Sequence, residues 1–351
     1  MTSLTQVAIT ARKIIRYGIF FIIFLLVGRI LLSAGISIYR KIFPAPPPKP
    51  TLAFGKLPAI SFPAPINSTN FTFTLETVEG DYPKLASQAK VFFMLKPSSN
   101  LLSLETAKAR AEALGFDPNA QQVSQTVYRF PNQKAPSNLE VNIVTGAFSI
   151  SYDLKADPSP INQKPPFPEI AASNARSFLS SANLLPIDLT GTVTHEFLKA
   201  ENTKFVTALS QSEAKLVKIN LFRKSYDNLP CLTQNARDAN VWFMISGLSD
   251  KSRQIVAAEY HYFPVDETQF ATYPIKTGEA AWSEFTAGKG HIAKTGNHQE
   301  GDSIKIRKIY LAYYDPGEVF DFLEPVIVFD EGTEDGFIAY IPAVTPDYYG
   351  Q

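Results

Sequence analysis

The chain has 351 residues with 33 basic and 33 acidic side chains, so its formal net charge at pH 7 is zero. Residues 309–351 carry nine Asp or Glu and no Lys or Arg, and a nucleic-acid partner needs a basic face, so we expect no nucleic-acid binding. A single cysteine, Cys231, excludes an internal disulfide framework, so the fold must rely on packing.

The first predicted element is the apolar segment 14–39, which carries Arg29 near its middle. About twenty apolar residues span the hydrocarbon core of a bilayer, so this segment is long enough to cross it even when tilted. We therefore predict a transmembrane helix over residues 14–39. Residues 1–13 before it form a predicted short cytoplasmic N-terminus.

A cleaved signal peptide is the alternative interpretation of the same segment. Three basic residues between positions 12 and 16 and the uncharged run 17–28 resemble the basic and apolar regions of such a peptide. Arg29 ends that run, however, and Leu31 and Leu32 occupy positions where a cleavage site needs small residues. The sequence therefore favours a retained anchor.

Arg29 is a candidate contact residue within the membrane. An arginine at mid-bilayer costs roughly 2.5 to 3.5 kcal/mol on insertion scales, which favours a partner carboxylate or a helix interface. Ser33 and Ser37, with glycines nearby, would let another helix approach closely. The alternative is that the Arg29 side chain snorkels to the membrane surface. A membrane protein partner through Arg29, Ser33 and Ser37 is thus one of two open interpretations.

Charge distribution predicts the orientation of the chain. Residues 1–66 contain eight Lys or Arg and no Asp or Glu, which leaves 25 basic and 33 acidic residues in 67–351. Three basic residues precede the apolar segment and two follow it, and the positive-inside rule then favours a cytoplasmic N-terminus. We predict a single-pass protein of the cell membrane whose large C-terminal domain is extracytoplasmic.

Residues 40–66 are a predicted proline-rich linker, with eight prolines in positions 44–66. Proline fixes φ and removes a hydrogen-bond donor, so this segment favours extended polyproline II at about 3.1 Å per residue. Fully extended, it would hold a domain on the order of 70 Å from the bilayer. It could also lie partly along the domain, because Phe54, Leu57 and Phe62 offer apolar contacts.

Residues 67–351 read as strands interrupted by three helices. Helices are predicted at 103–116, which starts at Ser103 and ends near Gly115, at 168–185 between two prolines, and at 278–287. Strands are predicted at 71–77, 91–95, 125–130, 139–152 (a hairpin broken at Thr145-Gly146), 194–199, 204–209, 216–223, 241–246, 254–263, 304–314, 325–329 and 336–342. Helices inserted singly among hairpin-spaced strands predict an α+β fold with antiparallel sheets.

The same pattern predicts repeated helix–β–β–β units. Residues 103–153 and 276–344 each run as one helix and about three strands, and residues 168–226 are a candidate third unit. We place a first α+β unit at 67–160. A second α+β region of one or two units follows at 161–351.

The first of these units resembles the PepSY type of bacterial extracytoplasmic module, with Ala107, Ala111 and Leu114-Gly-Phe at the helix positions. The C-terminal unit, KTGEAAWSEFTAGKGHI at 276–292 and the three strands after it, is similar to the ends of YycH and YycI proteins. The resemblance implies one transmembrane helix, PepSY-like outer domains and restraint of a sensor histidine kinase through membrane-helix contacts. It implies no catalytic residues.

An enzymatic alternative rests on three short motifs. Ser87-Gln-Ala-Lys90, Ser181-Ala-Asn183 and Lys276-Thr-Gly278 appear in the order used by penicillin-binding proteins, where a lysine helps activate the serine. The nucleophile should open a buried helix, whereas Ser87 leads into a strand-like segment. The Lys-Thr-Gly motif should lie on a strand, whereas Lys276 precedes a predicted helix. We therefore treat Ser87 and Lys90 as decoys.

Glu259 and His261 are a second weak candidate. The two-residue period of a strand puts their side chains on one face, where they would form a metal or acid–base site. An ordinary strand surface is the favoured interpretation. With no catalytic residue, cofactor or metal predicted, the sequence indicates a non-catalytic, membrane-anchored binding or regulatory protein of the bacterial envelope. The alternative is an envelope hydrolase, penicillin-binding or peptidase-like, held by the same helix.

Overall fold

The computed structural model describes residues 4–42, 48–63, 70–98, 100–201, 204–333 and 336–350. It divides into two compact units, Met1–Lys49 and Pro50–Gln351, and we describe each by itself. Parts of the predicted N-terminus (1–13) and linker (40–66) lie outside the described residues, at 1–3, 43–47 and 64–66.

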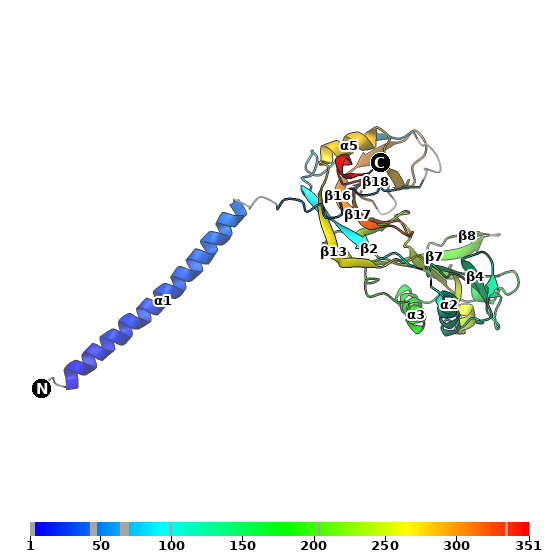
Figure 1. Cartoon of the computed structure of the whole chain (residues 1–351), viewed down its shortest axis with the longest axis horizontal. Coiled ribbons are helices and arrows are strands. Elements are labelled where there is room, and N and C mark those ends of the chain that lie inside the picture. The colour runs from blue at the N-terminus through cyan, green and yellow to red at the C-terminus, as the bar shows by residue number, and fades with distance from the viewer. Residues whose placement is uncertain are drawn as a thin grey trace. The chain divides into compact units, whose positions relative to one another are not determined.

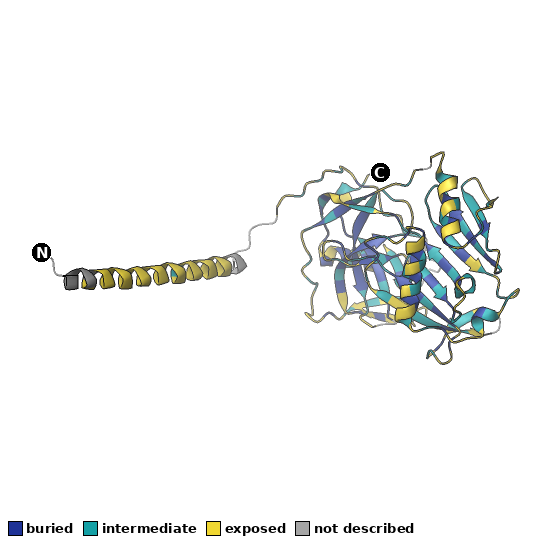
Figure 2. Cartoon of the chain, turned by 90° about the horizontal axis from the view of Figure 1, so that it is seen from below, coloured by how far each residue is buried: buried dark blue, intermediate teal, exposed yellow. Residues whose placement is uncertain are grey.

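The first unit is built on one helix, α1 (Leu4–Ile42). Within it, Ala11–Tyr39 is long and apolar enough to cross a membrane. Its large apolar side chains are exposed, Phe24 by 71% for example, as Figure 2 shows along the helix. The predicted apolar helix is therefore confirmed. A signal sequence near the N-terminus can pass the same test of length and apolarity, so retention of the anchor stays a prediction.

The second unit contains a nine-stranded antiparallel sheet in the order β3-β4-β5-β6-β12-β11-β9-β7-β8. Hairpins build half of it, and Gly146 at φ +76° makes the predicted turn between β5 and β6. The strands are β3 (Gln121–Gln122), β4 (Val127–Pro131), β5 (Ser137–Asn142), β6 (Phe148–Tyr152), β7 (Val193–Glu201), β8 (Lys204–Thr207), β9 (Leu216–Leu221), β11 (Val241–Ile245) and β12 (Ile255–Tyr260).

Two helices, α2 (Ser103–Ala113) and α3 (Pro168–Ser181), cover one face of this sheet (Figure 1). Their buried positions are mostly alanines, Ala107 and Ala111 in α2 and Ala171, Ala172 and Ala175 in α3. Small side chains let the helix backbones approach the sheet, where alternate residues of the strands complete one core cluster.

The other large sheet has seven strands. Its path is β10-β16-β17-β18-β14, with β2 pairing both β17 and β13. A parallel pair, β1 with β15, and helix α5 (Gly278–Thr286) pack against it through a second core cluster. The strands are β1 (Thr72–Leu75), β2 (Gln88–Met94), β10 (Cys231–Thr233), β13 (Val265–Pro274), β14 (His291–Lys294), β15 (Ser303–Ile306), β16 (Lys308–Asp315), β17 (Phe322–Asp330) and β18 (Ile338–Pro342).

The predicted α+β class is confirmed, since an apolar N-terminal helix precedes mostly antiparallel sheets and a few helices. All three predicted helices are present, and the structure adds a short one, α4 (Lys251–Gln254). Sequence analysis missed β13, because its first half is polar and exposed and contains a bulge between Asp266 and Phe270. The single strand predicted at 304–314 is two strands, β15 and β16, which pair with different partners.

From the order of elements along the chain, we divided the domain into residues 67–160 and residues 161–351. The strand pairing does not follow this division. The nine-stranded sheet contains strands from both sides of that boundary, because β6 pairs with β12. Strand β2 pairs with β13 and β17 of the other sheet. Helix α2 and the strands after it, and α3 with β7–β9, do form successive helix–strand units on one sheet.

Residues 50–62, which we call the strap, belong to the second unit. Leu57 is fully buried; its amide donates to the Tyr348 carbonyl at 2.8 Å, and its carbonyl accepts from the Gly350 amide at 2.8 Å. Phe62 stacks on His291 with ring centroids 5.4 Å apart. This part of the linker therefore lies along the domain, which was the alternative interpretation of the proline-rich segment.

Candidate functional site

Arg223 is the centre of a buried charged cluster between the two large sheets. It follows β9 of the nine-stranded sheet, and its Nε lies 2.7 Å from Oδ2 of Asp315 at the end of β16 in the seven-stranded sheet. Its Nη1 lies 3.0 Å from Oδ2 of Asp188, which follows α3. These three side chains are 8% exposed or less, so water screens their attraction very little.

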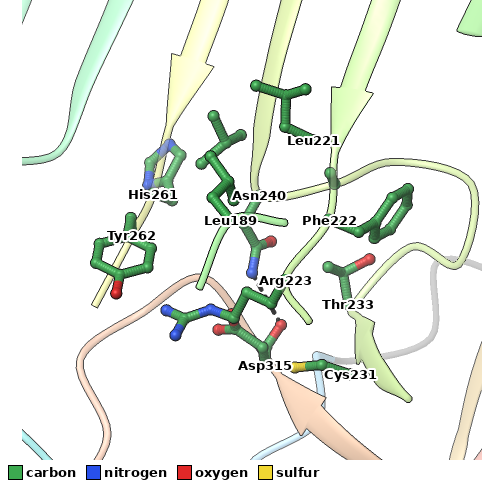
Figure 3. Close-up of a pocket in the computed structure, with 12 residues that line it drawn as sticks. Leu189, Leu221, Phe222, Arg223, Cys231, Thr233, Asn240, His261, Tyr262 and Asp315 are labelled. Atoms are coloured by element: carbon green, nitrogen blue, oxygen red, sulfur yellow. Dashed lines mark hydrogen bonds and ion pairs between the residues drawn. The ribbon is translucent and has the colours of Figure 1, made fainter. Parts of the chain in front are cut away.

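The remaining polar atoms of this cluster are also paired. Arg223 Nη2 donates to the Phe263 carbonyl, and the guanidinium lies 4.3 Å from the ring centroid of Tyr262 (Figure 3). The hydroxyls of Tyr226 and Tyr262 donate to the two oxygens of Asp188 at 2.6 and 2.8 Å. All three nitrogens of the guanidinium thus have partners.

Because the nitrogens of the guanidinium all have hydrogen-bond or ion-pair partners, the Arg223 cluster has a structural role. Burial raises the pKa of the Tyr226 hydroxyl and of the Cys231 thiol, so both stay protonated at neutral pH. The cavity among these residues is about 10 Å³, which is room for one water at most. A substrate has neither space nor a free donor here, and the cluster serves to join the two sheets.

A second cavity, which we call the strap cleft, has a volume of about 300 Å³. The strap supplies Ile60 and Phe62 to one side of it. The segment around α5 supplies Lys276, Glu284 and Lys289. Pro342, Pro346 and Tyr349 from the C-terminal end of the chain complete the lining, together with Ala59 and Gly290.

An ion pair lies in the wall of the strap cleft. Lys276 Nζ donates to Glu284 Oε2 at 2.8 Å, and the two side chains are 6% and 27% exposed. Thr277 caps α5 by accepting from the Ala280 amide at 3.2 Å, and the Lys276 amide donates to the Ala343 carbonyl at 2.8 Å. The cap and this backbone bond fix the base of the lysine, so its ammonium is held beside Glu284.

Glu324 lies behind Tyr349, which lines the strap cleft. The carboxyl group belongs to strand β17 and is 4% exposed, and burial raises its pKa to about 8. The Tyr349 hydroxyl faces this carboxyl and lowers its pKa, but by less than burial raises it. Within the described part of the chain, neither that hydroxyl nor Glu324 Oε2 has a hydrogen-bond partner. Burial of this carboxyl is costly when it is charged, so the neutral acid is favoured.

A third cavity, of about 470 Å³, opens beside the helices of the nine-stranded sheet. It lies where α2 and α3 end and α4 begins, and its polar lining includes Asn174, Ser177, Ser181 and Gln254. Asp250 is used to cap α4, since its side chain accepts from the Ser252 amide at 3.0 Å. Charged side chains line it as well, among them Asp117, Lys134 and Lys251.

The structure separates the serine and lysine of the enzymatic motif. Ser87 is exposed just before β2, and Lys90 lies on β2, where side chains three positions apart point to opposite faces. Lys90 Nζ instead pairs with Asp227 Oδ1 at 2.7 Å. Ser181 lies on α3, and its hydroxyl donates to the Phe178 carbonyl at 2.7 Å. Activation of Ser87 by Lys90 therefore has no support in this geometry.

The structure brings Glu259 and His261 together. His261 Nε2 lies 2.9 Å from Glu259 Oε2, and the side chains are 44% and 36% exposed. In the part of the chain that the structure describes, no cluster of three or more His, Cys, Asp or Glu could hold a metal ion. A half-exposed pair at the end of β12 is an ordinary polar surface contact.

The three membrane candidates occupy one face of α1. Arg29, Ser33 and Ser37 are four residues apart, which aligns them along a helix, and all three are exposed. Ser33 Oγ donates to the Ile30 carbonyl at 2.8 Å, so this hydroxyl is satisfied within the helix. Arg29 is the charged residue on that face.

Sequence analysis missed Arg223, Asp188, Asp315 and Glu324. The partners of Arg223 come from segments distant in the chain, so no local spacing reveals them. Glu324 did carry a signal, because it interrupts FLEPVIVF, a run that reads as a buried strand. An acid in such a run is buried with it.

No protein-family model matches this chain, and no curated protein sequence matches it. Among solved structures, an uncharacterized protein from Eubacterium rectale ATCC 33656 is similar over 80% of this chain and 90% of that chain. The sequence identity is 11% and the TM-score is 0.36. At that score the similarity carries no argument about fold or function.

Arg223→Leu should lower the free energy of unfolding by about 3–5 kcal/mol, because Asp188 and Asp315 would stay buried without a countercharge. The measurement is urea unfolding of the full chain in detergent, followed by tryptophan fluorescence. Arg129→Leu is the control: it breaks a half-exposed pair with Glu140, at 2.7 Å, and should cost at most about 1 kcal/mol. Equal losses in both variants would contradict the structural role of the cluster.

Glu324→Gln should remove a pH dependence of stability. Because the folded-state pKa of about 8 lies above the ordinary 4.5, the neutral acid stabilises the fold below pH 4.5, and this contribution is lost as the pH rises through 8. The free energy of unfolding of the wild type should therefore fall by on the order of a few kcal/mol between pH 5 and pH 8.5. The glutamine variant should not show this fall. Urea midpoints at both values test this, with Glu112→Gln on the exposed side of α2 as control. A parallel loss in the Glu324→Gln variant would refute the assignment.

Proposed function

We propose that this chain is a single-pass, membrane-anchored binding or regulatory protein of the bacterial envelope and that it is not catalytic. One observation carries the proposal: the 29-residue apolar segment Ala11–Tyr39 exposes its large apolar side chains, and a bilayer is the environment that buries such a surface. The second unit then works as a tethered domain with two cavities large enough for a ligand.

The proposal places the second unit outside the cytoplasm. It rests on the basic residues that precede the apolar segment and on the acidic excess that follows it. The resemblance to PepSY-type and YycH–YycI-type proteins supports the same orientation and adds a partner, a membrane protein such as a sensor kinase that α1 contacts. The stripe of Arg29, Ser33 and Ser37 on one face of α1 is the surface we assign to that contact.

The alternative function, an envelope hydrolase, has less support from the geometry of its candidate residues. Ser87 lies just before β2 and Lys90 lies on that strand, so they do not meet at a helix start as the motif requires. The Glu259–His261 pair has no third group to orient it among the described residues. No observation favours catalysis at either place.

Protease added to intact spheroplasts should digest the second unit, because we place it outside the cytoplasmic membrane. Immunoblotting for a C-terminal tag would follow the loss of the full chain, and a cytoplasmic protein serves as the control for cell lysis. Protection of the tag until the cells are opened would reject this topology. Release of the tagged chain into the soluble fraction by carbonate would instead reject the anchor.

Arg29→Leu should abolish a crosslink between α1 and its membrane partner, because the arginine loses a countercharge or helix contact in the bilayer. Crosslinking in native membranes followed by mass spectrometry measures the partner. Arg16→Leu is the matched control, since it removes an arginine near the start of the same helix. An unchanged crosslink in the Arg29→Leu variant would mean that Arg29 snorkels to the surface and has no partner.

A further inference from the structure

The strap cleft contains a buried cation with donors to spare. The Lys276 side chain is 6% exposed, and an ammonium group has three N–H donors. Within the described residues, Glu284 Oε2 at 2.8 Å is the hydrogen-bond partner of Nζ. Unmade hydrogen bonds of a buried charged group are costly, so the remaining donors favour an acceptor in the cavity beside them.

The charge of the cleft is not balanced. Lys276 and Lys289 line it as cations, and Glu284 lines it as the one anion. The Lys289 amide donates to the Glu284 carbonyl at 3.1 Å, which fixes its backbone at the end of α5. Among the described residues, the exposed Lys289 forms no ion pair. The cleft therefore has one positive charge without a counterion, which a monoanion would complement.

The rest of the lining is apolar. Ile60 and Phe62 come from the strap, and Pro342 and Pro346 come from the C-terminal end. The volume of about 300 Å³ is at the small end of ligand pockets, so a ring or short chain with one charged group fits it. Tyr349, in front of the buried Glu324, adds an aromatic face to the same cavity.

We propose that the strap cleft binds a small, largely apolar monocarboxylate. Its carboxylate accepts hydrogen bonds from the free donors of Lys276 and pairs with Lys289, while its apolar part packs on Ile60 and Phe62. An amine of the same shape would meet two ammonium groups and be repelled. A phosphate dianion would bring a second negative charge beside Glu284 and be less well matched.

Occupancy of the cleft has a consequence for the strap. Because Ile60 and Phe62 belong to the strap, a ligand packed on them adds contacts that hold this segment on the domain. The backbone bonds of Leu57 with Tyr348 and Gly350 are part of the same attachment. Ligand binding should therefore slow hydrogen exchange at the amides of Leu57 and Gly350.

The test uses the full chain in lipid nanodiscs, with phenylacetate as the probe and phenethylamine and 2-phenylethanol as analogues of similar shape. Saturation-transfer NMR should show saturable phenylacetate binding, with both analogues at least about tenfold weaker. Lys276→Gln should lower the affinity for phenylacetate by about tenfold or more, and Lys289→Gln should lower it by a smaller factor. Lys155→Gln, an exposed lysine on the loop after β6, is the matched control and should bind as wild type.

Exchange measured by mass spectrometry supplies a second readout, in which phenylacetate slows the amides of Leu57 and Gly350 and phenethylamine does not. Three results would overturn the proposal: no saturable phenylacetate binding, equal binding of the amine, or equal weakening by Lys155→Gln and Lys276→Gln. If Lys276→Gln fails to fold, Lys289→Glu reverses an exposed charge in the same cleft. An affinity for phenylacetate unchanged by Lys289→Glu would then also overturn it.

Discussion

The buried guanidinium of Arg223 is the interaction on which the arrangement of the second unit depends. It contacts Asp315 of the seven-stranded sheet and Asp188 beside the nine-stranded sheet, and it lies 4.3 Å from the ring centroid of Tyr262. A charge removed from water is tolerated only where its partners are in place, so the two sheets have to meet in one geometry. The clusters of apolar side chains supply most of the burial, and the ions set how the layers are joined.

The strap, residues 50–62, belongs to the same unit. Leu57 is buried and Phe62 stacks on an aromatic ring of the domain, so this part of the predicted linker is packed. The compact unit therefore begins at Pro50, whereas the sequence placed the end of the linker at residue 66. The strap also forms a wall of the cleft that holds Lys276 and Glu284. Any ligand in this cleft contacts the strap, and the strap follows the apolar N-terminal helix in sequence.

Local patterns predicted the elements well where the elements are locally encoded. The helix that begins at Ser103, the proline-bounded helix at Pro168 and the hairpin at Gly146 depend on neighbours within a few residues, and all are present. The predicted cap by the Ser103 side chain was wrong, because the N-cap is Leu102 and no side chain caps this helix. Strand β13 was missed because pairing with β2, far away in sequence, is what buries Ala271 and Tyr273. The candidate sites also differ in whether local sequence reveals them. Glu259 and His261 meet two residues apart in one segment, whereas the partners of Arg223 come from three distant segments.

The sequence by itself determined the apolar helix, the α+β class and the positions of the three main helices, because these follow from composition, period and caps. Only the tertiary structure decided that residues 50–62 pack on the domain, that Arg223 joins two sheets and that Lys276 and Glu324 are buried near a cavity. The physical reason is that burial and ion pairing depend on which distant segments meet. A chain of 351 residues offers many such pairings, and strand register selects one.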